Sequence, residues 1–206
     1  MGGVTDLLKL SPNTKVYKYD PSENQLPIKD QQVFTCEGVN LISHHTPGHT
    51  KDHMCFLFKE ETALFMGDNV LGHGTSVFEH LATYISSLHK MKDIQVSEGP
   101  GYPGHGEVIQ NCKKEIAHYI THRETRERQV IGVMKKAEAE AERPSHYHGF
   151  ITPMEIARMI YPEIDAELYS AAEKNCIEVL KKLEEESVVV RDGERWILKG
   201  NIRSTI

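Results

Sequence analysis

The length and composition of the chain limit the kinds of protein it can be. It has 206 residues, of which 39% are hydrophobic and 26% are charged, and its formal net charge is −6. This length accommodates one full domain and a smaller one, and the composition is that of a globular protein. The acidic balance argues against a surface that coats nucleic acid throughout. No apolar run approaches the roughly 20 residues that cross a bilayer, so we expect no membrane partner.

The four cysteines carry no recognisable pairing pattern. Cys36, Cys55, Cys112 and Cys176 are widely spaced, and no C-x-x-C pair occurs. This spacing favours reduced, mostly structural thiols in a reducing compartment.

The first part of the chain alternates predicted helices and strands. Apolar spacing predicts a helix over residues 2–10, and alternation predicts strands over 14–19, 31–36, 53–58 and 62–66. A hairpin turn at Glu37-Gly38 leads into a further strand from residue 39. Residues 76–91 are predicted to be helical, and a long helix is predicted from about Glu107. The apolar face predicted for 76–91 comprises Val77, Leu81, Tyr84, Ile85 and Leu88.

The last part of the chain has the pattern of a small separate domain. A polar, proline-containing stretch at 138–150 marks a boundary, and we predict domains over residues 1–143 and 144–206. Thr152, Pro153 and Glu155 form a capping box with proline at the first helical position. A second helix over 166–186 is followed by a hairpin around Asp192-Gly193, which together predict a winged-helix-like unit. The predicted apolar face of this second helix comprises Leu168, Ala172, Cys176, Val179, Leu180 and Leu183.

Three short motifs place possible metal ligands beside glycines. These are His49 in TPGHT, Asp68 in FMGDN and His105 in GYPGHG. Zinc accepts neutral imidazole and carboxylate, and a carboxylate has two oxygens with which to bridge a pair of ions. Because each motif lies at a strand end or leads into a helix, the three side chains are predicted to share one cleft. We regard any one of these motifs as weak evidence and the three together as strong evidence.

These motifs resemble the third, fourth and fifth metal motifs of the metallo-β-lactamase superfamily. The stretches TPGHTKDHM, GDNVLGHGTSVFE, YPGHGEVI and YITHRETRERQ also resemble the endoribonucleases of the beta-lactamase-like protein 2 family. This resemblance covers nearly the whole chain and implies an α/β (α+β) fold, an αββα sandwich followed by a winged-helix-like domain. It further implies a hydrolase with two zinc ions that cleaves single-stranded RNA in the mitochondrial matrix, with the cytosol as the alternative location.

The resemblance also implies roles for the three residues. His49 would serve the first zinc, His105 the second, and Asp68 would bridge both ions and act as the catalytic residue. In the family, a His-x-His-x-Asp-His motif precedes a Gly-Gly pair, whereas only Met1 precedes Gly2-Gly3 here. We therefore expect a partial sandwich that lacks its N-terminal part, two protein ligands per ion and impaired activity. An uncovered sheet face and edge would follow, and a homodimer is left open.

Two other functions remain open at this point. A glyoxalase-II-like thioester hydrolase shares the three motifs, and a non-catalytic chain that binds RNA or a protein partner would need none of them. The basic segment 113–136 is interpreted as a solvated helix face rather than an RNA-binding surface. Trp196 is interpreted as a core residue of the small domain.

The remaining histidines are interpreted as supporting or exposed residues. His53 and His73 each lie a few positions from a predicted ligand, where a histidine more often supports its neighbours than binds metal. His44 and His45 are expected to be structural or exposed, and His146 and His148 are expected on a linker surface.

Overall fold

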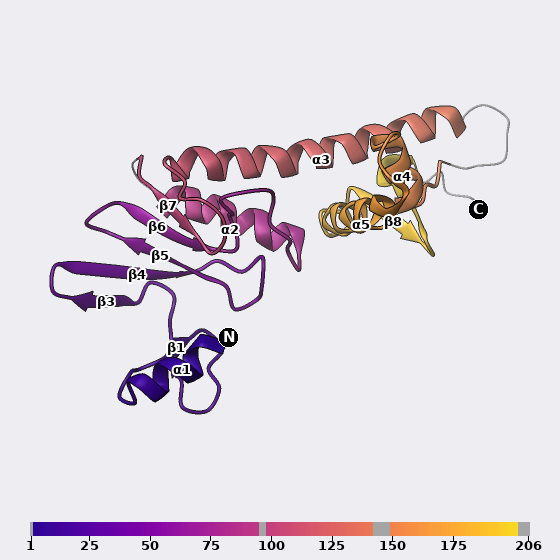
Figure 1. The fold of residues 1–206 in the computed structure, drawn as a ribbon. Coiled ribbons are helices and arrows are strands. Elements are labelled where there is room, and N and C mark those ends of the chain that lie inside the picture. Colours follow the sequence, from indigo (N-terminus) through magenta and orange to yellow (C-terminus); the bar gives the residue numbers. More distant parts are fainter. Residues whose placement is uncertain (1, 95–97, 142–148, 202–206) are drawn as a thin grey trace. The chain divides into compact units, whose positions relative to one another are not determined.

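The computed structural model describes residues 2–94, 98–141 and 149–201, which form two compact units (Figure 1). The first unit is Met1–Ile120 and the second is Thr121–Ile206. The division falls inside helix α3 (Cys112–Ala141). The boundary predicted at 143/144 lies outside the described residues.

A five-stranded sheet forms the centre of the first unit. The strands are ordered β3-β4-β5-β6-β7, with the first four antiparallel and β7 parallel to β6. The predicted hairpin is confirmed, because β3 and β4 pair as antiparallel strands on either side of the turn. Gly38 in this turn has a φ of +72°, a conformation that glycine adopts without strain. The strands are β3 (Val33–Cys36), β4 (Val39–His45), β5 (Met54–Phe58), β6 (Ala63–Gly67) and β7 (Gly101–Pro103).

Helices cover one face of this sheet. Along β6, Leu64 and Met66 are fully buried while Phe65 between them is 40% exposed, which is the period-two alternation of a strand. The thiol of Cys112, at the start of α3, donates to Met66 Sδ at 3.3 Å. Helix α2 (Leu81–Ile94) adds the buried side chains Leu81, Tyr84, Leu88 and Met91.

The opposite face is covered only in part. Tyr17 packs edge-on against Phe34 at 4.9 Å between ring centroids, and Tyr19 stacks on His45 at 3.8 Å. Both tyrosines come from the N-terminal segment, which contains α1 (Gly2–Leu10) and the parallel pair β1 (Tyr17–Lys18) and β2 (Leu26–Pro27). Phe65 stacks on Tyr102 of β7 and is still 40% exposed. The expected apolar exposure on the sheet is therefore present at Phe65.

Two helix starts predicted in the first unit are wrong. The helix predicted from residue 76 begins at Leu81, and Val77 is 71% exposed. The carbonyl of Val77 instead accepts a hydrogen bond from His49 Nδ1, so this segment serves as a loop. The long helix predicted from about Glu107 begins at Cys112, where Asn111 Oδ1 accepts from the amide of Lys114 and caps the helix.

The second unit has the predicted two helices and hairpin. Thr152 Oγ1 accepts from the amide of Glu155, and the Glu155 carboxylate accepts from the amide of Thr152, which confirms the capping box. Leu168 is 53% exposed, against prediction, because it belongs to a short 3-10 turn before the second helix. The elements are α4 (Pro153–Ile160), η1 (Ala166–Leu168), α5 (Tyr169–Glu185), β8 (Val189–Asp192), β9 (Arg195–Leu198) and η2 (Lys199–Asn201).

The core of the second unit confirms the interpretation of Trp196. This side chain is buried, and so are the other predicted residues of the α5 face, Ala172, Cys176, Val179, Leu180 and Leu183. Lys182 Nζ pairs with Glu127 Oε2 at 2.7 Å and with Glu186 at 2.8 Å. Burial alone would lower the pKa of Lys182, but the hydrogen bonds to the two carboxylates raise it.

Among the residues described, no helix is long and apolar enough to cross a membrane.

We predict that Thr152→Ala lowers the free energy of unfolding of the second unit by about 1 kcal/mol, because it removes the acceptor for the Glu155 amide. Urea unfolding followed by the fluorescence of Trp196, the only tryptophan, measures this unit directly. The matched control is Ser170→Ala at an exposed position of α5, which should change stability by less than about 0.5 kcal/mol. Equal losses in the two variants would contradict the assigned cap.

Candidate metal centre

Asp68 directly follows β6, and its carboxylate lies close to two glycines, Gly67 and Gly104, where a side chain would not fit. Gly67 has a φ of +52°, and a Cβ there would lie 2.6 Å from His53 Nε2. A Cβ at Gly104 would collide with Asp68 Oδ1. The amide of Gly104 donates to the Gly67 carbonyl at 2.7 Å, so the backbone of the His105 loop approaches the strand end closely.

The structure brings the three predicted ligands together. His49 Nε2 lies 3.7 Å from Asp68 Oδ2, and His105 Nε2 lies 3.7 Å from Asp68 Oδ1. Each imidazole therefore faces a different oxygen of one carboxylate. A gap of 3.7 Å is too long for a hydrogen bond. Two ligands of one tetrahedral zinc, each about 2.0–2.2 Å from the ion, stand about 3.4 Å apart, so the observed spacing is close to that of a shared ion.

The burial of Asp68 also fits a cation. Its Oδ1 atom is buried and has no hydrogen-bond partner in the part of the chain that the structure describes. A buried carboxylate oxygen without a donor is costly, and a metal ion would compensate its charge. The His105 side chain is 72% exposed, so the centre is open to solvent on that side.

The orientation of His49 is set by its other ring nitrogen. Nδ1 lies 3.0 Å from the Val77 carbonyl, which can only accept, so Nδ1 carries the proton. In the neutral ring the lone pair is then on Nε2, the atom that faces Asp68. A hydrogen bond of this kind is what orients a metal-binding histidine.

The protein supplies few ligands for each ion. Within residues 2–94, 98–141 and 149–201, no group of three or more His, Cys, Asp or Glu side chains is arranged around a single ion. The pairs His49–Asp68 and His105–Asp68 offer two ligands per ion, whereas catalytic zinc usually has three from the protein. The donor types and spacing fit zinc, and further ligands are needed to complete each ion.

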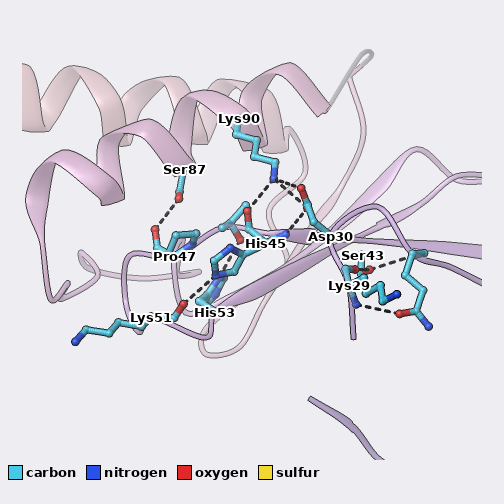
Figure 2. Close-up of polar contacts among 11 residues, drawn as sticks. Lys29, Asp30, Ser43, His45, Pro47, Lys51, His53, Ser87 and Lys90 are labelled. Atoms are coloured by element: carbon cyan, nitrogen blue, oxygen red, sulfur yellow. Dashed lines mark hydrogen bonds and ion pairs between the residues drawn. The ribbon is translucent and has the colours of Figure 1, made fainter. Parts of the chain in front are cut away.

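The loop that carries His49 is also held at its base (Figure 2). Lys90 Nζ donates to both oxygens of Asp30 at 3.0 Å and to the His45 carbonyl at 2.9 Å, while Asp30 Oδ1 accepts from the His45 amide at 2.7 Å. Ser87 Oγ donates to the Pro47 carbonyl at 2.6 Å. These contacts attach the end of β4 and the start of the loop to α2.

His53 lies behind the turn. Its Nδ1 atom is 3.0 Å from Thr46 Oγ1, and its Nε2 atom is buried without a hydrogen-bond partner in the described residues. Burial lowers the pKa of His53 to about 4. These are the surroundings of a neutral residue that packs under Gly67, as the interpretation of a supporting residue requires.

His73, His45 and His44 have other surroundings. A Cβ at Gly106 would meet His73 Nδ1, which places His73 beside the His105 loop. His45 Nε2 bonds the Lys51 carbonyl at 2.9 Å. Burial lowers the pKa of His44, whose Nε2 atom is buried without a described partner. His146 and His148 lie outside the described residues.

A half-open pocket of about 450 Å³ lies on another side of the His49 loop. None of the three predicted ligands lines it. Its walls come from the loop and from the segment that leads into α2, and comprise Pro47, Gly48, Thr50, Lys51, Glu79, His80 and Thr83.

Two family models match the sequence. Residues 3–110, about half of the chain, match the metallo-beta-lactamase superfamily. The chain belongs to the metallo-β-lactamase superfamily. Residues 152–196 match the beta-lactamase associated winged helix domain. The fold predicted from the sequence, a partial metallo-β-lactamase fold with a C-terminal winged-helix domain, is confirmed. The superfamily typically binds zinc.

Fungal proteins are similar to this chain over most of its length. The lactamase-like protein notP of Aspergillus sp. is 41% identical over 193 residues, which cover 91% of this chain and 60% of that protein. The atrochrysone carboxyl ACP thioesterase dmxR1 of Cryptosporiopsis sp. is 39% identical over 209 residues, covering 97% and 64%. This chain thus spans about 60% of the length of the relatives it matches. These relatives support the thioester-hydrolase alternative better than the endoribonuclease interpretation.

Solved structures share the fold at low identity. A beta-lactamase domain protein from Burkholderia ambifaria superposes with a TM-score of 0.68 at 17% identity, over 87% of this chain and 54% of that one. A metallo-beta-lactamase family protein from Thermus thermophilus superposes with a TM-score of 0.63 at 22% identity, over 86% and 56%. These likenesses bear on the fold alone.

We predict that acid weakens the fold through His53. The folded chain keeps this ring neutral down to a pKa of about 4, whereas the unfolded chain binds the proton near pH 6.5. Stability is therefore fully present above pH 6.5 and falls as the pH approaches 4, by up to about 3 kcal/mol. In His53→Gln, which cannot titrate, the loss measured by urea unfolding between these pH values should be smaller.

The matched control for His53 is His118→Gln, at a histidine side chain of the same unit that is 71% exposed. This variant should keep the pH dependence of the unmodified chain. If His53→Gln and His118→Gln lose stability equally across this range, His53 is not buried as the structure has it.

Proposed function

We propose that this chain supplies the His49–Asp68–His105 side of a zinc-dependent thioester hydrolase. The observation that carries the proposal is one carboxylate facing two imidazoles through different oxygens, each at 3.7 Å. The substrate class rests on the relatives, two of which are named atrochrysone carboxyl ACP thioesterases.

The chain's own residues would divide the work of such a site. His49 and His105 would each hold one ion through Nε2, and Asp68 would contact both ions with its two oxygens. When bound, zinc would polarise a thioester carbonyl and activate a water molecule. The negative charge of Asp68 would balance part of the charge of the ions, and the exposed His105 side would admit the substrate.

The basic segment of α3 gives little support to RNA as the substrate. Arg123 is only 8% exposed. The Arg126 guanidinium lies 4.7 Å from the centroid of the Tyr161 ring and donates to Gln129 Oε1 at 2.8 Å. One positive charge that would track a phosphate backbone is therefore mostly buried, and another is engaged within the second unit. Single-stranded RNA as a partner and a mitochondrial location remain predictions from the sequence resemblance, and a homodimer remains a prediction from the expected uncovered sheet face and edge.

We predict metal-dependent thioester hydrolysis that requires Asp68. Asp68→Asn keeps the size of the side chain but removes its charge, so it should lower zinc-dependent hydrolysis of an acyl thioester by at least about 100-fold, since outer-shell partners alone cost about 10–100-fold. The rate is measured with the zinc-loaded chain, and again after chelation, which should abolish it. Because two protein ligands per ion are fewer than usual, we expect the rate of the unmodified chain to be low.

The control is Asp20→Asn, at an exposed aspartate of the same unit, which should leave the rate unchanged. Single-stranded RNA is assayed in parallel under the same zinc loading. Cleavage of RNA without thioester hydrolysis would reject the substrate class. No zinc-dependent hydrolysis of either substrate would reject the catalytic role of this chain.

A further inference from the structure

A buried amide links the loops that carry His49 and Asp68. Asn69 follows Asp68 in sequence and is fully buried. Its Oδ1 atom accepts from the amide of His49 at 2.9 Å, and its Nδ2 atom donates to the carbonyl of Thr46 at 2.7 Å. One side chain thus satisfies two main-chain groups of the His49 loop, 20 and 23 residues away in sequence.

A buried hydroxyl makes a second link between the same two loops. Ser76 Oγ lies 2.5 Å from the carbonyl of Asp68 and 2.9 Å from the carbonyl of Val77. A hydroxyl has one proton, so it donates to one carbonyl or is shared between the two. The Val77 carbonyl also accepts from His49 Nδ1, so Ser76 connects the main chain of Asp68 to the group that orients the His49 ring.

These contacts form a closed ring. It runs from Asp68 through Asn69 to the His49 amide, and from the His49 imidazole through Val77 and Ser76 back to the Asp68 carbonyl. The ring therefore constrains both the main chain and the imidazole of His49 relative to Asp68. Tyr84 of α2 anchors it, because its hydroxyl donates to the carbonyl of Asn69 at 2.6 Å.

We propose that Asn69 and Ser76 are positioning residues that set the separation of His49 and Asp68 for metal binding. This rests on the proposed function only in taking the pair as zinc ligands. Neither residue offers an atom to the ion in this arrangement, since the polar side-chain atoms of both are engaged with the main chain. A displacement of His49 relative to Asp68 would break hydrogen bonds on one side of the ring.

The test uses Co²⁺ as the probe, because its visible absorption depends on the geometry of its ligands. Ser76→Ala removes one oxygen and Asn69→Ala removes both amide contacts. Both variants should shift the Co²⁺ spectrum and weaken Co²⁺ affinity by about 10–100-fold. Ser76→Thr, which keeps the hydroxyl, should retain most of the affinity and the spectrum of the unmodified chain.

The matched control is Lys90→Ala. It removes the contacts of Lys90 with Asp30 and the His45 carbonyl, so it loosens the base of the same loop without touching the ring. We expect this variant to lower the melting temperature and to leave the Co²⁺ spectrum unchanged. If Ser76→Ala and Asn69→Ala behave as Lys90→Ala does, both residues are merely structural and the proposal is overturned.

Three further outcomes are decisive. If Asn69→Ala does not fold, as judged by circular dichroism, the pair Ser76→Ala and Ser76→Thr decides the proposal. An unmodified chain with no Co²⁺ spectrum overturns it together with the zinc site. A chain that binds Co²⁺ but hydrolyses no thioester would reject the proposed function, while the spectra of the variants would still decide the positioning role.

Discussion

The carboxylate of Asp68 faces two imidazoles across gaps of 3.7 Å, and one of its oxygens is buried without a hydrogen-bond donor among the described residues. A charge in this position is costly unless a cation compensates it. The positions next to the carboxylate cannot carry a side chain, because a Cβ at Gly104 would collide with the carboxylate and a Cβ at Gly67 would collide with His53. Within residues 2–94, 98–141 and 149–201, no hydrogen-bond donor therefore balances the charge on Asp68 Oδ1.

The support for this charge comes from residues other than the three predicted metal ligands. Asn69 and Ser76 join the His49 loop to the main chain of Asp68, and Tyr84 attaches the carbonyl of Asn69 to α2. The sheet places the loops near one another, and buried hydrogen bonds then define the positions of the side chains. The second unit is stabilised separately, by its capping box, the buried Trp196 and the paired Lys182.

Much of the fold and the ligand triad could be predicted from local patterns. The alternation around Phe65, the Glu37-Gly38 turn and the Thr152 cap depend on residues close in sequence, and all appear in the structure. Val77 and Leu168 have helical spacing but lie in loops or turns, because the Val77 carbonyl is used by His49 and Leu168 precedes α5. The role of Asn69 could not be recognised, since the partners of its side chain lie at least 20 residues away and a single asparagine after a strand has no specific pattern. The endoribonuclease interpretation depends on motifs that thioesterases of the superfamily share, which is why the sequence does not separate the two.

The central claim is that the two oxygens of Asp68 serve two different ions. Anomalous diffraction at the zinc absorption edge, from crystals grown with Zn²⁺, tests it most directly. The account predicts one peak between Asp68 Oδ2 and His49 Nε2 and another between Asp68 Oδ1 and His105 Nε2, each about 2.0–2.2 Å from its ligands. Zinc peaks only at other sites, with the Asp68 carboxylate hydrogen-bonded to protein groups instead, would contradict it.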